Sequence, residues 1–483
     1  MIKNISFNQQ VFKGLKYNTL AKVLDAIFAI FYGVFMARIL DPSVFGILAM
    51  ASIFTGISAL LIDFGTGDAI IRHKEDLTSN EFLSSIFWLN TFIGLVIALI
   101  FVLLSKPIST FFGHEIIKTI IIIYSINIIF SAMSNVPRIS IRKKLDFKSI
   151  FYHRAIILPI SGFIGIILAL KGYGIWSIIV QQIIITPLET FLFIYLSKWF
   201  PSFSFKRKHI YEIFHFSSYL SATKFLNYFT KKGDLFLIGK FIGDYQLGLY
   251  SKGYQLTVRM LKVINGIIIG VLYPSISKVK DNQEKLQSSF LNVSQVIFTI
   301  YGFIFLLGIL FSKQIVNLVL GEKWSGLIPL IPIFLLLALF FAFSSIGSHY
   351  LKAFGETKLL FKVVTFTSVL TIVSFIIGLN WGITGVAIGY LISTIILSMM
   401  VIYNSLKILK IALKKYLPIF IKEIVVLIIT LISIKFLVHN FFNKSDFIYL
   451  LTGVGLALFI QFLYHFLFKT MFYKSLKTVI SFK

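Results

Sequence analysis

The sequence predicts an all-α membrane protein that crosses the bilayer many times. Of its 483 residues 57% are hydrophobic and only 13% are charged, and the mean hydropathy is +0.90, values that a soluble domain does not reach. The apolar runs are continuous, as in spanning helices, rather than alternating, as in a β-barrel. The chain has no cysteine, so disulfides, thiolate chemistry and cysteine-ligated metals are excluded.

Fourteen apolar segments are long enough to cross a bilayer as helices. We expect them at about 17–37, 43–62, 83–104, 116–136, 155–170, 174–196, 213–230, 246–273, 290–311, 327–351, 359–379, 383–404, 419–438 and 447–468. The polar stretch before them is not expected to be a signal peptide, because it has no small-residue cleavage site.

Lys and Arg gather on alternate connections, which predicts that both termini are cytoplasmic. The formal net charge of +27 is therefore interpreted as a topology signal that faces anionic lipid, and no nucleic acid is expected as a partner. The basic segment 141–154 is predicted to lie in the headgroup layer before the fifth span.

An internal repeat appears when the sequence is compared with itself at an offset of 202 residues. The matched pairs are Tyr17 with Tyr219, Lys22 with Lys224, Asp25 with Asn227, Arg38 with Lys240, and Gly46 with Gly248. Six spans per repeat give two lobes of the same orientation. We therefore predict six-helix lobes at 1–205 and 206–410, and two further helices with a basic cytoplasmic tail at 411–483.

Charged side chains inside the predicted spans are the candidate site. A charge facing lipid at the bilayer centre costs about 3 kcal/mol or more, so such residues belong in a protein interior or a hydrated cavity. Helical spacing puts Lys252, Arg259 and Lys262 on one face of the eighth span. The residues predicted to bind an anionic headgroup are Lys22, Arg38, Lys224, Lys252, Arg259 and Lys262.

Four aspartates are the candidates for coupling or gating: Asp25, Asp63, Asp68 and Asp234. Asp25 lies one turn from Lys22, and the two either line a cavity or merely lock helix packing as a pair. Asp63 and Asp68 flank two glycines where the chain can bend, and a carboxylate of this pair that faces Arg72 would be a gate latch. The alternative is an ordinary helix end.

Enzyme signatures are missing from the sequence. It has no GxxxxGK[ST] phosphate loop, no HExxH and no GxSxG, and its histidines show no metal spacing. We expect no catalytic residue, no metal and no cofactor.

Several motifs in order along residues 10–405 resemble those of Wzx-type polysaccharide flippases, the lipopolysaccharide and oligosaccharide exporters. They are ARILDPSVFGILAMASIF, LIDFGTGDAIIRHKE, VPRISIRKKLDF, GYGIWSIIVQQ, DLFLIGKFIGDYQLGLYSKGYQL, LYPSISKV, LGEKW and AFGETKLLF. That family belongs to the multidrug/oligosaccharidyl-lipid/polysaccharide exporter superfamily.

The resemblance implies a two-lobed fold of twelve or fourteen helices in a bacterial inner membrane. It also implies alternating-access, cation-coupled translocation of undecaprenyl-pyrophosphate-linked oligosaccharide, the repeat unit of O-antigen, capsule or exopolysaccharide. The partners implied are that substrate, membrane lipids, a glycan polymerase and other polysaccharide-assembly proteins.

Three other functions stay open on the sequence. A drug antiporter of the same superfamily would favour an acidic, aromatic cavity, whereas the predicted interior is rich in Lys and Arg. A membrane-embedded glycan polymerase or ligase would need a sizeable outer loop, and the predicted outer loops are short. A lipid scramblase or a structural subunit would need no stacked interior charges.

Overall fold

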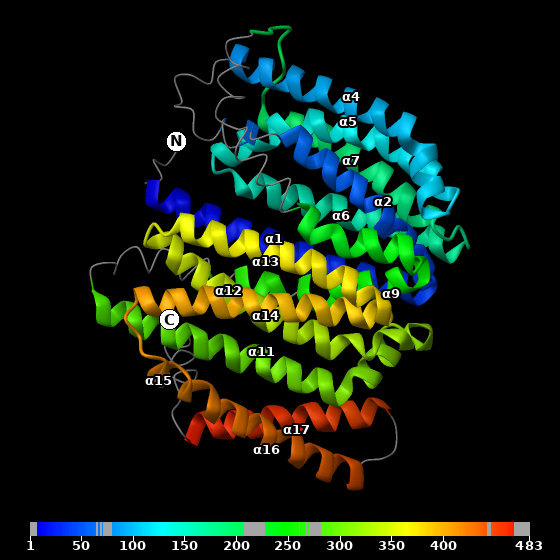
Figure 1. Cartoon of the computed structure of the whole chain (residues 1–483). Coiled ribbons are helices and arrows are strands. Elements are labelled where there is room, and N and C mark those ends of the chain that lie inside the picture. The colour runs from blue at the N-terminus through cyan, green and yellow to red at the C-terminus, as the bar shows by residue number, and fades with distance from the viewer. Residues whose placement is uncertain are drawn as a thin grey trace. The chain divides into compact units, whose positions relative to one another are not determined.

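The computed structural model describes residues 7–63, 66–67, 70, 80–206, 228–259, 261–266, 268–269, 282–441 and 446–467. Within these ranges every regular element is a helix (Figure 1), which confirms the predicted fold class. The chain forms two compact units, Met1–Gly248 and Leu249–Lys483. The finer division into lobes at 1–205, 206–410 and 411–483 stays a prediction.

The first unit is a set of long helices joined by short turns. They are α1 (Phe7–Ile39), α2 (Pro42–Asp63), α4 (Asn80–Phe112), α5 (Ile116–Lys143), α6 (Phe147–Leu170) and α7 (Trp176–Ser197), followed by a helix over 228–241. α4 packs along α5, α5 along α7, and α1 along α6. Gly113 has a φ of +75° at the turn between α4 and α5, where a residue without Cβ avoids strain.

The second unit repeats the pattern of long antiparallel helices. Its elements are α9 (Asp244–Tyr254, which contains the boundary between the units), η2 (Gln255–Arg259), α11 (Gln283–Val319), η3 (Glu322–Leu327), α12 (Leu330–Ala353), α13 (Thr357–Gly378), η4 (Leu379–Trp381), α14 (Gly382–Ile408), α15 (Leu413–Tyr416), α16 (Pro418–Phe441) and α17 (Asp446–Leu467). α12, α13 and α14 pack on one another, and α16 and α17 pair beside α11 (Figure 1).

Eleven helical segments of the described chain are long and apolar enough to cross a membrane, and one of them, Thr357–Ile408, contains both α13 and α14. Counted separately, these helices match twelve of the fourteen predicted spans. The two predicted spans that remain, 213–230 and 246–273, include residues outside the described ranges. The expected number of spans is therefore compatible with the structure.

Residues 141–154 contain the end of α5 at Lys143 and the start of α6 at Phe147, so α6 begins earlier than the predicted span at 155. Leu145 turns the chain with a φ of 55°, and the Asp146 carboxylate caps α6 by accepting from the Ser149 backbone N–H at 3.2 Å. An Asp at the N-cap is a helix-start signal. That the segment lies in the headgroup layer stays a prediction.

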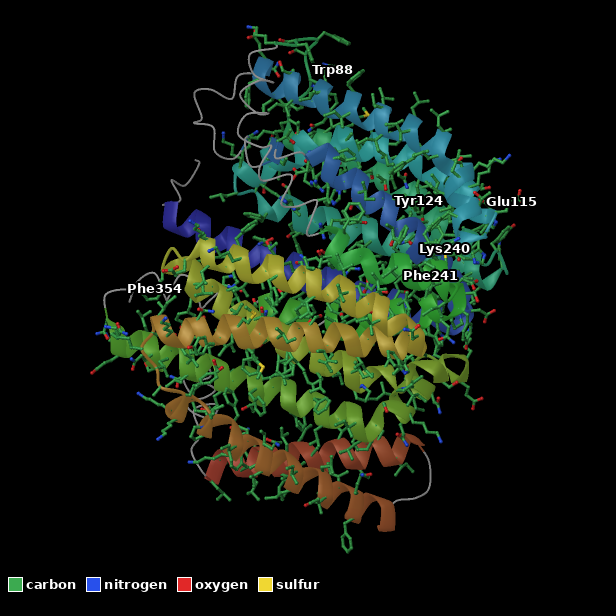
Figure 2. All side chains as sticks on the ribbon, viewed as in Figure 1. Trp88, Glu115, Tyr124, Lys240, Phe241 and Phe354 are labelled. Carbon is green, nitrogen blue, oxygen red and sulfur yellow. The ribbon has the colours of Figure 1, made fainter. Side chains whose placement is uncertain are left out.

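The seventh predicted span ends too early, because the helix over 228–241 continues past the expected end at residue 230. Lys231 and Lys232 therefore lie inside a helix rather than at its outer end. The turn falls at Ile242 and Gly243, beside Lys240 and Phe241 (Figure 2). There the Lys240 Nζ donates to the carbonyl oxygen of Phe111 at 2.6 Å and lies 4.4 Å from that ring's centroid.

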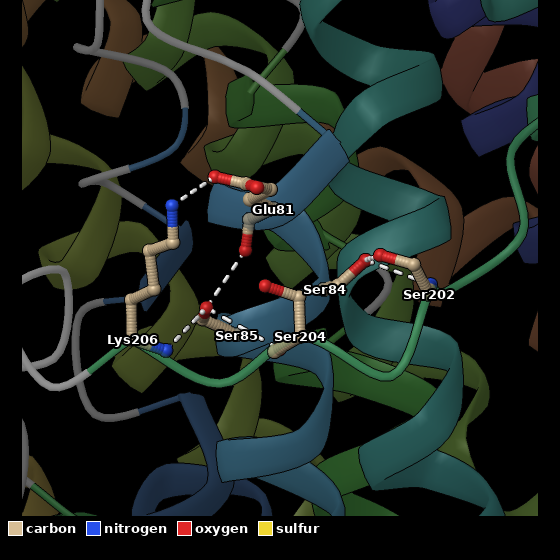
Figure 3. A network of polar contacts seen from close by, with 6 residues as sticks. All are labelled: Glu81, Ser84, Ser85, Ser202, Ser204 and Lys206. Carbon is tan, nitrogen blue, oxygen red and sulfur yellow. Dashed lines mark hydrogen bonds and ion pairs between the residues drawn. The ribbon is translucent and has the colours of Figure 1, made fainter.

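The segment that follows α7 is fastened to the start of α4 by polar contacts (Figure 3). The Ser202 backbone N–H donates to Ser84 Oγ at 2.9 Å, and the Lys206 backbone N–H donates to Ser85 Oγ at 3.1 Å. The Lys206 ammonium also forms an ion pair with Glu81. These contacts therefore hold the segment from Ser202 to Lys206 against the start of α4.

α2 and α9 cross at two glycines that the sequence repeat pairs. A Cβ added at Gly46 would lie 1.8 Å from the carbonyl oxygen of Asp244, and one added at Gly248 would lie 1.8 Å from the carbonyl oxygen of Pro42. The offset of 202 relates Pro42 to Asp244 just as it relates Gly46 to Gly248. The contact is therefore reciprocal, as two repeats related by a pseudo-two-fold axis would make it.

We expect Gly46→Ala to lower the thermal stability of the purified protein in detergent. The added methyl group meets backbone atoms, which cannot rotate away, and overpacking of this kind costs about 1–3 kcal/mol. Gly455→Ala in α17 is the matched control, since a Cβ there meets no atom within 4 Å. That change should be neutral or stabilising by up to about 1 kcal/mol. Equal stabilities of the two variants would contradict the close crossing.

Candidate functional site

The centre of the candidate site is an ion pair between Asp25 of α1 and Arg154 of α6. Each side chain is 32% exposed, and α1 and α6 pack along each other. The pair is incompletely satisfied within the described chain, because Asp25 Oδ1 and Arg154 Nε are buried without a hydrogen-bond partner. A buried polar atom with no partner is unfavourable, so it favours a visiting proton, water or ligand group.

Glu189 and Arg138 continue the line of charges away from this pair. Glu189 of α7 interacts electrostatically with Arg154 and with Arg138 of α5, and Arg138 interacts in turn with Asp63 at the end of α2. Negative and positive groups therefore alternate from α1 through α6, α7 and α5 to the end of α2. Alternation of this kind lets each charge in a low-dielectric interior lie beside one of opposite sign.

A buried network of hydrogen bonds links Asp63 to Arg138. Thr66 Oγ1 donates to the carbonyl oxygen of Asp63 at 2.7 Å and accepts from the amides of Asn90 and Asn135, each at 3.4 Å. The Asn135 carbonyl accepts from an Arg138 guanidinium N–H at 3.4 Å. We call the full set the polar chain: Asp25, Arg154, Glu189, Arg138, Asn135, Asn90, Thr66 and Asp63.

The partner of Asp25 differs from the one that the sequence predicted. Among the residues that the structure describes, Asp25 pairs with Arg154 and forms no ion pair with Lys22, whose side chain is exposed. Lys22 lies only one turn away on the same helix, but its side chain points to a different surface. Tertiary packing brings α6 against α1 and supplies a guanidinium instead.

The other predicted residues of the first unit are dispersed. Arg38 is exposed and Asp234 is 3% exposed. The Asp234 carboxylate accepts from the Leu235 backbone N–H at 2.7 Å. Lys224, Asp68 and Arg72 lie outside the described residues, so the latch between a carboxylate and Arg72 stays a prediction. Asp63 interacts electrostatically with Arg138.

The predicted cationic face of the eighth span is interrupted. Lys252 is 2% exposed, so its side chain lies inside the protein. Arg259 and Lys262 are exposed. The reason is the π-helical turn η2 (Gln255–Arg259), because a wider turn shifts the following residues around the helix axis. The expectation of one shared face for Lys252, Arg259 and Lys262 is therefore wrong.

Lys262 is held against two aromatic rings. Its Nζ lies 4.0 Å from the ring centroid of Phe341 and donates to the Tyr254 hydroxyl at 2.9 Å. Cation–π contacts keep an ammonium group in place without neutralising it. Lys262 and Arg259 thus present positive charge on the second unit, where an anion can reach them.

Sequence reasoning missed Arg138, Arg154, Glu189, Asn90 and Asn135. It assigned the two arginines to a cytoplasmic loop, because it ended one helix at residue 136 and began the next at residue 155. The Asp146 helix cap would have moved Arg154 onto a helix. Glu189 was available as an acidic residue inside an apolar span, which is a signal of function by itself.

These features define the class of this protein as a multi-pass α-helical membrane protein with an internal network of fixed charges. The chain belongs to a family of polysaccharide biosynthesis proteins, whose family model matches residues 35–329.

Three relatives extend this assignment. The chain is 26% identical over 400 residues to the lipopolysaccharide biosynthesis protein WzxC of Escherichia coli, covering 81% of this chain and 80% of that protein. It is 23% identical over 361 residues to the teichuronic acid biosynthesis protein TuaB of Bacillus subtilis, covering 74% of each. It is 22% identical over 369 residues to the probable low-salt glycan biosynthesis flippase Agl15 of Haloferax volcanii, covering 74% of this chain and 76% of that protein.

Solved structures share the fold. The lipid II flippase MurJ in an inward closed conformation superimposes with a TM-score of 0.69 at 19% identity, over 98% of this chain and all (100%) of that chain. An inward-facing multidrug resistance MATE transporter of the MOP superfamily gives a TM-score of 0.62 at 14% identity, over 80% of this chain and 94% of that chain. These two superpositions show that the chain shares this fold.

A double-mutant cycle tests the pairing of Asp25. We expect Asp25→Asn and Arg154→Gln to be non-additive in thermal stability, with an interaction energy of about 0.5–3 kcal/mol, because either change alone leaves the other group unpaired. The same cycle with Lys22→Gln in place of Arg154→Gln should be additive within about 0.5 kcal/mol. Coupling of Asp25 to Lys22 and not to Arg154 would show that Lys22 is the partner, as the sequence predicted.

Proposed function

We propose that this protein is a flippase that moves undecaprenyl-pyrophosphate-linked oligosaccharide across the bacterial inner membrane. The chain would then act as a transporter and not as an enzyme. The observation that carries the proposal is fixed charge on membrane-crossing helices, with the polar chain in the first unit and Arg259 and Lys262 in the second. The printed names of its relatives, which concern lipopolysaccharide, teichuronic acid and glycan biosynthesis, support the same substrate class.

The chemistry of the substrate explains why such charges are needed. A pyrophosphate carries negative charge that hydrocarbon does not solvate, so its passage needs groups that replace its water. Arg offers planar bidentate contacts to phosphate oxygens, and Lys offers a compact positive charge. The lipid tail can stay in the bilayer while the headgroup moves along the protein.

Orientation follows from the distribution of basic residues. We place both termini in the cytoplasm, since Lys and Arg mark alternate connections as inside. Under this orientation the turn at Lys144 and the segment with Lys208 face the cytoplasm, whereas Ser325 and Asn443 face the periplasm.

Cysteine labelling tests this orientation directly, because the chain has no native cysteine. Single cysteines at Lys144 and Lys208 should react with a membrane-impermeant maleimide only after the inner membrane is opened. Those at Ser325 and Asn443 should react in intact spheroplasts. Labelling of Lys144→Cys from outside would reverse the assignment.

Arg259 is the residue we propose to contact the pyrophosphate. It is exposed at the end of η2, three residues from Lys262. Hydrogen bonds to charged groups contribute about 1.5–3 kcal/mol, so Arg259→Ala should weaken binding of the lipid-linked oligosaccharide about 10- to 100-fold. Arg259→Lys should recover part of the loss, since it keeps the charge without the planar fork.

Binding is measured with purified protein in nanodiscs, with an organic cation as the competing ligand class. Lys415→Ala, an exposed lysine on α15, is the matched control and should bind as wild type does. Wild-type binding by Arg259→Ala would remove this residue from the site. Preference of the wild-type protein for organic cations would support the drug antiporter instead.

Coupling to a proton is proposed at Asp25. Arg154 is the ion-pair partner of the Asp25 carboxylate. A pyrophosphate that competes for Arg154 would leave the carboxylate unpaired and make it easier to protonate. Substrate binding and proton uptake would then be linked, each changing the affinity for the other by the same factor.

Asp25→Asn separates coupling from binding, since it keeps the shape of the side chain and removes its titration. We expect the variant in proteoliposomes to bind lipid-linked oligosaccharide while its transport loses dependence on a pH gradient. Lys22→Gln is the control. It should keep that dependence, because Asp25 pairs with Arg154 and not with Lys22 in the described chain. A wild-type response of Asp25→Asn to the gradient would place the switch elsewhere.

A further inference from the structure

The C-terminal helix pair contains a buried acidic side chain that the polar chain does not include. α16 and α17 pack on α11 and on each other, and they expose apolar residues such as Ile428, Phe436 and Phe462. Glu423, in the second turn of α16, faces inward and is only 1% exposed. A carboxyl group in such a position needs an explanation in terms of its partners.

The groups around Glu423 are neutral hydrogen-bonding side chains. The Gln295 side-chain amide of α11 donates to Glu423 Oε1 at 3.2 Å. The Thr299 hydroxyl, one turn further along α11, faces the same carboxyl group and is otherwise without a partner in the described chain. Tyr464 of α17 lies within electrostatic range.

No cation of the described chain forms an ion pair with Glu423. Lys422, its neighbour on α16, and Lys414 and Lys415 on α15 are exposed. His465 of α17 is buried, and its ring centroid lies 4.9 Å from that of Tyr464. Tyr416 of α15, the remaining titratable group on that side, packs on Phe290 and Phe420. Glu423 thus differs from Asp25 and Glu189, which lie beside arginines.

We propose that Glu423, Gln295 and Thr299 form a proton-binding site between α16 and α11. An ionised carboxylate removed from water without a cation is strongly unfavourable, and such a group neutralises itself by taking up a proton. In the protonated group one oxygen accepts from Gln295, and a small adjustment would let the O–H donate to Thr299 Oγ1, which is buried without a partner in the described chain. When the proton leaves, the Thr299 hydroxyl can turn and donate to the carboxylate.

Protonation of Glu423 controls how tightly α16 packs on α11. Phe298 of α11 packs on Phe420 of α16 at a centroid distance of 5.1 Å. The Gln283 and Gln287 amides of α11 each donate to the carbonyl oxygen of Leu409, at the end of α14, at 2.9 Å. Loss of the proton therefore adds a buried negative charge where α16 packs on α11.

Infrared difference spectroscopy of the full-length protein during a pH titration tests the site. We expect a carbonyl band of a protonated carboxylic acid that shifts when glutamate side chains are isotopically labelled and that disappears in Glu423→Gln. Glu189→Gln is the matched control, since Glu189 is also an acidic residue in a spanning helix but lies near two arginines. This variant should keep the band.

Thermal unfolding provides the second measurement. Wild type should lose thermal stability as rising pH removes the proton, and Glu423→Gln, which resembles the protonated form, should lose less. A band that persists in Glu423→Gln, or the same pH dependence of stability in both proteins, would overturn the proposal. Neither measurement involves transport, so the outcome is independent of the proposed flippase activity.

Discussion

The constraint on which this structure depends is that an ionic side chain in a spanning helix must find its partner within the protein. Water and counterions are absent from hydrocarbon, so an unpaired charge there is costly. Asp25 and Arg154 satisfy this condition from two different helices, and Glu189, Arg138 and Asp63 extend the same alternation. The order of packing in the first unit, with α6 against α1 and α7 and with α7 against α5, is the order that brings these groups together.

Close backbone packing is the second means by which the helices associate. Lipid tails are as apolar as leucine, so burial of apolar surface contributes little between spanning helices, and small residues that allow close approach matter more. Gly46 and Gly248 allow α2 and α9 to touch through main-chain atoms. Gly46 meets Asp244 and Gly248 meets Pro42, and the offset of 202 residues relates the first contact to the second. The same close contact is therefore made twice.

The three acidic residues Asp25, Glu189 and Glu423 have three different environments. Asp25 has a direct ion pair, Glu189 lies near two guanidinium groups, and Glu423 has only neutral partners. The same residue class therefore serves different purposes according to its partners. In the first unit the acidic groups lie near guanidinium groups, whereas in the C-terminal helix pair the carboxyl group lies among neutral hydrogen-bonding side chains.

The sequence alone determined the fold class, the approximate number of spans and the family, because these depend on hydropathy, on the placement of Lys and Arg and on local motifs. It also determined the Gly46–Gly248 correspondence, since a repeat is visible without coordinates. It did not determine which charges meet. Lys22 is one turn from Asp25 in the sequence, but Arg154, 129 residues away, is the partner, and Glu189 joins them from a further helix. A single π-helical turn likewise separated Lys252 from Arg259. Side-chain partners in a helical bundle depend on helix rotation and on which helices are neighbours, and tertiary packing alone sets both.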